Sequence, residues 1–190
     1  MNYIVFDLEW NQCPYGKERE NKKIPFEIIE IGAVKLNEER KEIERFQQVI
    51  RPTVYHRLHF RTKEILNIDQ ETLEEGIPFS KAVRKFLCWC GEDVMFCTWG
   101  QADLVELQRN MKYYKLSHLL KGPVFYYDVQ KIFGIEYEGN KSSRSLEYAI
   151  DYLQMKKEEC LHRALHDAWY TAQIFASLPM EVITKNYSID

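Results

Sequence analysis

Short runs of apolar residues, spaced as in β-strands, dominate the first fifty positions of the chain. Residues 3–9 are rich in β-branched and aromatic side chains, which favours a buried strand. Two more runs, 26–36 and 44–50, are separated by the polar turn at 37–40, and Pro52 ends the second of them. The three runs together predict an antiparallel meander.

Further along the chain, apolar residues recur at the spacing of amphipathic helices, interrupted by short strand-like runs. Polar residues that commonly cap helices precede some of these segments. The predicted elements are two helices that Thr62 and Ser80 would cap, a strand at 93–98, a helix around 104–107, a strand or helix start within 124–133, and helices at 146–153 and about 164–178. A meander followed by alternating helices and strands predicts an α/β fold, a mixed five-stranded sheet with helices on both faces.

The 190 residues suit one domain, and no repeat, low-complexity segment or linker divides them, so we expect residues 1–190 to form a single domain. The longest apolar runs are far shorter than the roughly 20 residues of a transmembrane helix. Met1 leads directly into the first strand, without a basic segment or a cleavage site. We therefore expect neither a membrane span nor a secretory signal.

Charge and cysteine content narrow the classes of partner. Lys and Arg total 26 against 29 Asp and Glu, a net charge of −3, so any contact with nucleic acid must be local. The five cysteines lack zinc-like spacing and favour a reducing, cytoplasmic setting. Cys88 and Cys90 are interpreted as buried thiols at a helix end, the alternative being a redox or metal pair.

Acidic residues interrupt the otherwise apolar first strand. Asp7 and Glu9 lie two positions apart, so both side chains leave the same face of the strand, with Cα atoms roughly 6.5–7 Å apart. Leu8 faces the opposite way, into a core. Buried carboxylates are costly unless a cation meets them. The alternative is a strand end at which both carboxylates reach water.

Two further acidic positions stand at helix starts. Asp103 follows a strand and a glycine turn, where an acid also complements the helix dipole. Asp167 stands in the first turn of the last helix, and His162 lies in the loop before it, from which it could turn over the same pocket. His166, next to Asp167, is expected on the helix surface.

These positions together resemble the three motifs of the DEDDh 3′→5′ exonucleases. The matching residues are Asp7-x-Glu9, Asp103, and His162-x-Ala164-x-x-Asp167-Ala168. Residues 27–34 also resemble that family's second strand, and the branch most resembled contains the histone-mRNA 3′ exonucleases and their bacterial relatives. The resemblance implies a ribonuclease H-like mixed sheet, in agreement with the predicted order of elements.

The chemistry of phosphodiester hydrolysis suits these residue types. Two hard cations, Mg²⁺ or Mn²⁺, would be held by the carboxylates of Asp7, Glu9, Asp103 and Asp167. Without metal the carboxylates repel, by about 4 kcal/mol for two unit charges ~4 Å apart at an effective dielectric constant near 20. In this interpretation His162 is the general base that accepts the proton of the attacking water. These five residues are the predicted catalytic set.

The resemblance also implies a substrate, the 3′ end of single-stranded RNA or DNA, with RNA favoured and 5′-mononucleotides as products. The backbone around Trp10 and Asn11, where the family often has a small residue or threonine, would contact the 3′-hydroxyl of the terminal nucleotide. Ile68 would wedge against the last base, with core packing as the alternative, and Asn67 replaces the family's glycine beside it.

Cations near the site could hold neighbouring phosphates, although solvated surface charge is the alternative for each. The candidates are Lys141, Arg144 and Arg163. Two other functions stay open: an oligoribonuclease-like phosphodiesterase that acts on very short oligomers, and a non-catalytic nucleic-acid-binding module on the same fold.

Overall fold

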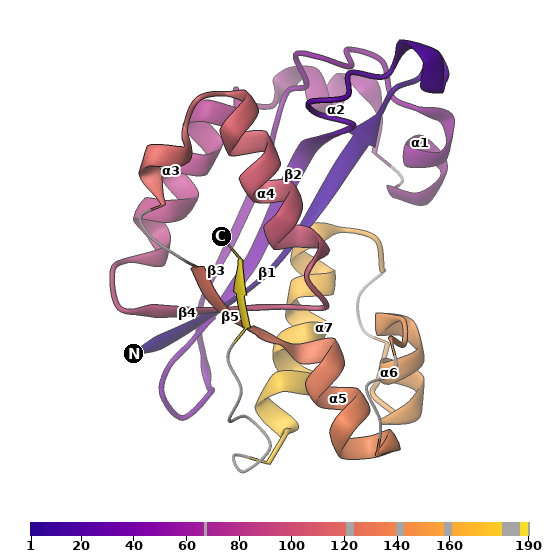
Figure 1. Cartoon of the computed structure of the whole chain (residues 1–190). Helices are drawn as coiled ribbons and strands as arrows, with labels where there is room; N and C mark the ends of the chain where they lie inside the picture. Colours follow the sequence, from indigo (N-terminus) through magenta and orange to yellow (C-terminus); the bar gives the residue numbers. More distant parts are fainter. Residues whose placement is uncertain (67, 121–123, 140–142, 158–160, 180–186, 190) are drawn as a thin grey trace.

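A computed structural model describes residues 1–66, 68–120, 124–139, 143–157, 161–179 and 187–189. Its strands form one six-stranded sheet in the order β3-β2-β1-β4-β5-β6, with helices on both faces (Figure 1). The strands are β1 (Asn2–Gln12), β2 (Phe26–Leu36), β3 (Glu42–Val49), β4 (Val94–Thr98), β5 (Val124–Asp128) and β6 (Tyr187–Ile189).

Strand pairing confirms the predicted mixed sheet. Strands β1, β2 and β3 are antiparallel neighbours, whereas β4 and β5 join the sheet in parallel. The short strand β6 pairs antiparallel with β5 and adds a sixth strand to the five that were predicted. The segment 124–133 contains both alternatives, because β5 leads directly into a helix at Val129.

Seven α-helices and two 3₁₀ turns are present in the described part of the chain. They are α1 (Phe60–Leu66), α2 (Gln70–Glu75), α3 (Phe79–Cys90), α4 (Ala102–Tyr113), α5 (Val129–Glu138), α6 (Leu146–Tyr152), α7 (Ala164–Ser177), η1 (Lys17–Arg19) and η2 (Ser117–Leu119). Two predicted helix caps were wrong. Thr62 lies inside α1. Ser80 lies inside α3, which begins at Phe79 after Pro78 and has no side-chain cap. None of the described helices is long and apolar enough to cross a bilayer.

Alternation along β1 divides the core into two layers. Ile4, Phe6 and Leu8 pack with the side chains of α3 and α4 on one face of the sheet. Tyr3 and Val5 pack with α5, α6 and α7 on the other face. Because side chains alternate along a strand, Asp7 continues the second series and points to the α7 face.

Gly32 allows α7 to approach the sheet closely. It lies opposite Asp7 in the β1–β2 ladder. A Cβ atom at Gly32 would lie 2.0 Å from the backbone nitrogen of Leu165 and 2.1 Å from the carbonyl carbon of Ala164. No other residue fits there, so this glycine brings the first turn of α7, with Asp167, next to Asp7.

The two cysteines of α3 do not form a pair. Cys88 is exposed and Cys90 is buried, as expected for positions two apart on a helix. The interpretation of both as buried thiols therefore holds only for Cys90. Cys160 lies outside the described residues.

Candidate active site

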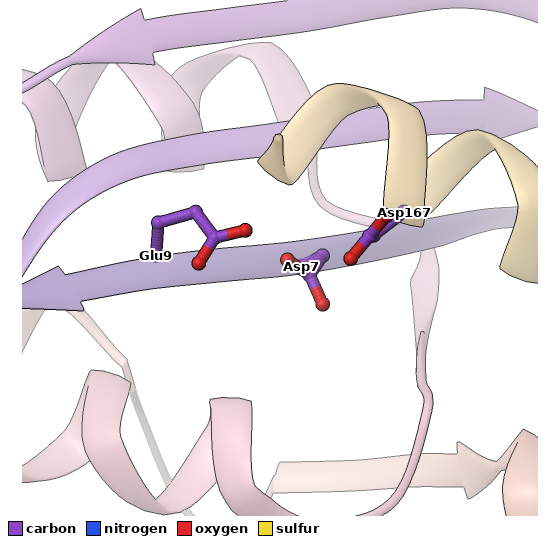
Figure 2. A group of neighbouring side chains, drawn as sticks. All are labelled: Asp7, Glu9 and Asp167. Atoms are coloured by element: carbon purple, nitrogen blue, oxygen red, sulfur yellow. The ribbon is translucent and has the colours of Figure 1, made fainter. Parts of the chain in front are cut away.

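Three carboxylates converge where β1 passes the first turn of α7. Figure 2 shows Asp7 and Glu9 on β1 and Asp167 on the helix above them. One oxygen of each side chain lies within 4.8 Å of the others, and all three side chains are half-buried. The structure thus brings together three of the four carboxylates that the sequence singled out.

Asp103 stands beside this group, in the first turn of α4. Strand β4 pairs with β1 only as far as Val5, so the edge of β1 beyond that point is open to the start of α4. The Leu8 backbone N–H donates to Oδ1 of Asp103 at 3.0 Å. Gly100, with φ +88°, makes the turn from β4 into α4 that puts Asp103 there.

The environment of the carboxylates favours their protonated forms. Burial, followed by the charges of Asp103 and Glu9, raises the pKa of Asp7 well above its ordinary value. Burial also raises the pKa of Glu9 to about 9, with the charge of Asp167 as the next contribution. Burial raises the pKa of Asp103 to about 7 and that of Asp167 to about 6. A site of clustered carboxylate oxygens without thiolates fits hard divalent cations, which would offset this repulsion.

A partly buried ion pair holds the loop in front of α7. Glu30, in the middle of β2, is fully buried. The Nε and Nη2 atoms of Arg163 donate to its two carboxylate oxygens at 3.1 and 2.8 Å, and Gln47 donates to it at 2.7 Å. The pair anchors the backbone between His162 and α7 to the sheet. In the sequence, the signal for this ion pair was Glu30 itself, an acidic residue within an apolar strand.

Two histidines flank Asp167. His162 is exposed, and its backbone adopts the left-handed region at φ +68°. Its backbone N–H donates to Oδ1 of Asp167 at 3.2 Å. His166 is half-buried rather than fully on the helix surface, and the charge of either histidine lowers the pKa of Asp167. Proximity alone therefore does not separate the two candidates for a general base.

The sequence profile of the exonuclease family RNase T matches residues 4–175. The chain belongs to this family. The exonuclease is 27% identical to the probable 3′-5′ exonuclease KapD of Bacillus subtilis (strain 168), over 90% of its own length and 82% of KapD. It is 25% identical to 3′-5′ exoribonuclease 1 of Rattus norvegicus, over 78% of its own length but only 45% of that protein.

The fold of the exonuclease also matches a solved relative. Its TM-score with the nuclease domain of 3′hExo, a DEDDh family member bound to rAMP, is 0.81 at 20% identity, over 100% of this chain and 96% of that domain. The mixed-sheet fold and the predicted resemblance to DEDDh 3′→5′ exonucleases are confirmed.

The side chains of two predicted substrate-binding residues make contacts within the exonuclease itself. The Asn11 side chain is fully buried; its amide donates to the carbonyls of Tyr55 and Arg57 and accepts from the His59 N–H. The side chain is therefore not available to a nucleotide, whereas a contact through the backbone at Asn11 stays a prediction. Trp10 is half-buried, and its ring lies 5.9 Å from that of Phe26, on the α3–α4 side. A contact from Trp10 to substrate stays a prediction.

The placement of Ile68 needs correction. Its side chain is 3% exposed and packs with Ile29, Leu66 and Leu73, so core packing, the alternative, is what the structure shows. Asn67 lies outside the described residues. On α1, Phe60 and Ile65 are 68% and 51% exposed. Their apolar side chains are accessible to a base, and their helical spacing did not distinguish them from core residues.

The raised pKa values predict how stability depends on pH in the absence of metal. Between about pH 4 and pH 9 the folded site retains protons that the unfolded chain has released, because the carboxyl pKa values are raised. The free energy of unfolding should therefore fall as the pH rises through this window. Melting temperatures in EDTA from pH 5 to pH 9 measure the effect, and added Mg²⁺ should reverse it most at the alkaline end. A stability that rises steadily with pH in EDTA would contradict it.

Proposed function

We propose that the exonuclease removes 5′-mononucleotides from the 3′ end of single-stranded nucleic acid, preferably RNA. The observation that carries the proposal is the convergence of Asp7, Glu9 and Asp167, with Asp103 beside them, on a chain of the RNase T family. The preference for RNA rests on the rat relative named an exoribonuclease and on the rAMP bound to the 3′hExo domain. The cytoplasmic location inferred from the cysteine pattern stays a prediction.

The residues divide the work of hydrolysis between them. When bound, two divalent ions, Mg²⁺ or Mn²⁺, would stabilise charge on the phosphate and leaving oxygen and acidify the attacking water. Asp7, Glu9 and Asp167 would hold them, with the second oxygen of Asp103 as a further ligand. The hydrogen bond from Leu8 to Asp103 fixes the direction of that carboxylate.

His162 would accept the proton of the attacking water on a ring nitrogen. Its exposure allows the imidazole to return the proton to solvent after each turnover. The left-handed backbone at His162 is a conformation that surrounding contacts must maintain. The ion pair of Arg163 with Glu30 and the hydrogen bond from His162 to Asp167 supply those contacts.

We expect cleavage to require a free 3′-hydroxyl end. A 3′-phosphate adds negative charge where the carboxylates converge, so the first cleavage should slow on the order of tenfold or more. The measurement is degradation of a 5′-labelled single-stranded oligomer ending in 3′-OH or 3′-phosphate, in RNA and DNA forms, with Mg²⁺. Products should shorten stepwise from the 3′ end and RNA should disappear faster.

A circular oligomer of the same sequence is the control, because it has no end. Cleavage of the circle, or equal rates for the two 3′ ends, would show that the enzyme does not recognise a terminus.

A further inference from the structure

Two of the three cations that the sequence suggested for phosphate binding are engaged elsewhere. Arg163 is bound to Glu30, and Nε of Arg144 donates to Glu138 at 2.9 Å. Lys141 lies outside the described residues. Neither arginine is therefore free to hold the rest of a polyanionic strand, and such a strand needs positive charge somewhere on its path.

A groove with a volume of about 910 Å³ carries such charge. It lies between α4, η2 and the start of β5, and Lys23, from the segment before β2, also lines it. Lys23, Arg109, Lys112 and Lys115 line the groove, and no acidic residue does among the described residues. The whole chain has a net charge of −3, so the positive charge of this groove is a local feature of the surface.

The three lysines of the groove are not neutralised. Arg109 donates to the Glu106 carboxylate beneath it. No ion pair of Lys23, Lys112 or Lys115 exists with any described residue, and all three side chains are exposed. Their charges are therefore directed to solvent or to a ligand.

The floor of the groove suits a strand with bases as well as phosphates. Met111, Tyr113 and Val124 line the groove together with the cations. Aromatic and apolar side chains between cations are the usual surface for single-stranded nucleic acid, whose bases stack while its phosphates meet the cations.

Helix α4 runs between the carboxylate site and the groove, which lie on opposite faces of the helix. Asp103 is in its first turn and Lys112 in its last. These residues are nine positions apart, about 14 Å along the axis at 1.5 Å per residue, and about half a turn apart around it. A strand that passes around the first turn of α4, about 10 Å across, would therefore cover roughly 24 Å. At ~3.4 Å per stacked nucleotide, about seven nucleotides span that path.

We propose that this groove binds the backbone phosphates of the same single strand whose 3′ end occupies the carboxylate site, about seven or more nucleotides upstream. The inference rests on the proposed exonuclease function. It assigns the exonuclease a length requirement: substrates of two nucleotides use the carboxylate site alone, whereas long strands also use the groove.

The test variant is Lys23→Ala combined with Lys112→Ala. Lys115 stays unchanged because its backbone is left-handed, at φ +58°. The matched control is Lys81→Ala with Lys85→Ala on α3, which removes the same charge from two other exposed lysines. Affinity for a 20-nucleotide single-stranded RNA is measured by fluorescence anisotropy across a salt series, with hydrolysis blocked by Asp7→Asn in every protein. Hydrolysis of a dinucleotide is measured with Asp7 intact.

The groove variant should weaken binding of the 20-mer on the order of tenfold at 50 mM salt and reduce the slope of log affinity against log salt by about 1.4, or 0.7 for each of two lost phosphate contacts. Dinucleotide hydrolysis should stay within about twofold of wild type. Equal losses in the control variant, or an unchanged slope, would overturn the proposal. The proposal would also be overturned if the groove bound a polyglutamate peptide that the RNA does not displace. That result would assign the groove to an acidic protein. If the wild-type protein hydrolyses neither the dinucleotide nor the 20-mer, the proposed function is wrong. The anisotropy measurement still tests whether the groove binds RNA.

Discussion

Asp7→Asn should abolish hydrolysis and leave the fold intact. One oxygen of Asp7 lies within 4.8 Å of an oxygen of Glu9 and of Asp167, so Asp7 is placed to share a cation with both. Asparagine keeps the shape of the side chain but removes the negative charge, and with it most of the affinity for a hard cation. We expect the rate to fall by at least about 10⁴, the order of the loss when a catalytic centre is disabled.

The same variant should be more stable than wild type in EDTA, because the charges around Asp7 repel one another when no cation is present. Melting curves at pH 8, with and without Mg²⁺, measure this. Mg²⁺ should raise the melting temperature of wild type more than that of the variant. Asp151→Asn is the control, since that carboxylate is exposed on α6 and pairs with Lys157. Activity of Asp7→Asn near that of the control would remove Asp7 from the site.

Replacement of His162 should cost on the order of 10² to 10⁴ in rate, whereas replacement of His166 should change the rate little. Both histidines influence Asp167, but only His162 lies on the exposed loop that faces solvent beside the carboxylates. Alanine at position 162 would also disturb the left-handed backbone at φ +68°. His162→Asn separates the two effects, because asparagine tolerates this conformation but has no basic nitrogen.

Single-turnover rates with Mg²⁺ are the measurement for the four proteins: wild type, His162→Asn, His162→Ala and His166→Asn. Both variants at position 162 should lose activity to a similar extent, and added imidazole should restore part of the rate of His162→Ala. A larger loss for His166→Asn would transfer the role of base to the helix. A loss in His162→Ala that is absent from His162→Asn would make the role of the residue conformational.

The elements of the sheet were largely predictable because their signals are local. Runs of apolar residues rich in β-branched side chains predict β1 and β2 without help from distant residues. The boundaries were less accurate, since β1 continues to Gln12, three residues past the predicted end at Glu9. The extension depends on pairing with β2, where Asn11 lies opposite Glu27, and this pairing is not visible in the spacing of β1 alone.

The substrate side of the site was the least predictable. Ile68 and Ile65 are both apolar and lie three positions apart, yet one is 3% and the other 51% exposed. A short segment with several apolar residues does not reveal which of them the rest of the protein covers. Asn11 is a polar residue beside catalytic acids, and only the folded loop at 55–59 shows that its amide is already fully bonded.

The sequence by itself determined the class of chemistry. Asp7 and Glu9 share a face because strand geometry requires it, and the spacing from His162 to Asp167 matched an exonuclease motif before any fold was known. The tertiary structure decided which groups meet. Gly32 lets α7 approach β2 closely, Arg163 bonds to Glu30 133 residues away, and Lys23 joins the face of α4 that carries Lys112. Such contacts depend on how separate elements pack, and the spacing of residues along one element carries no information about them.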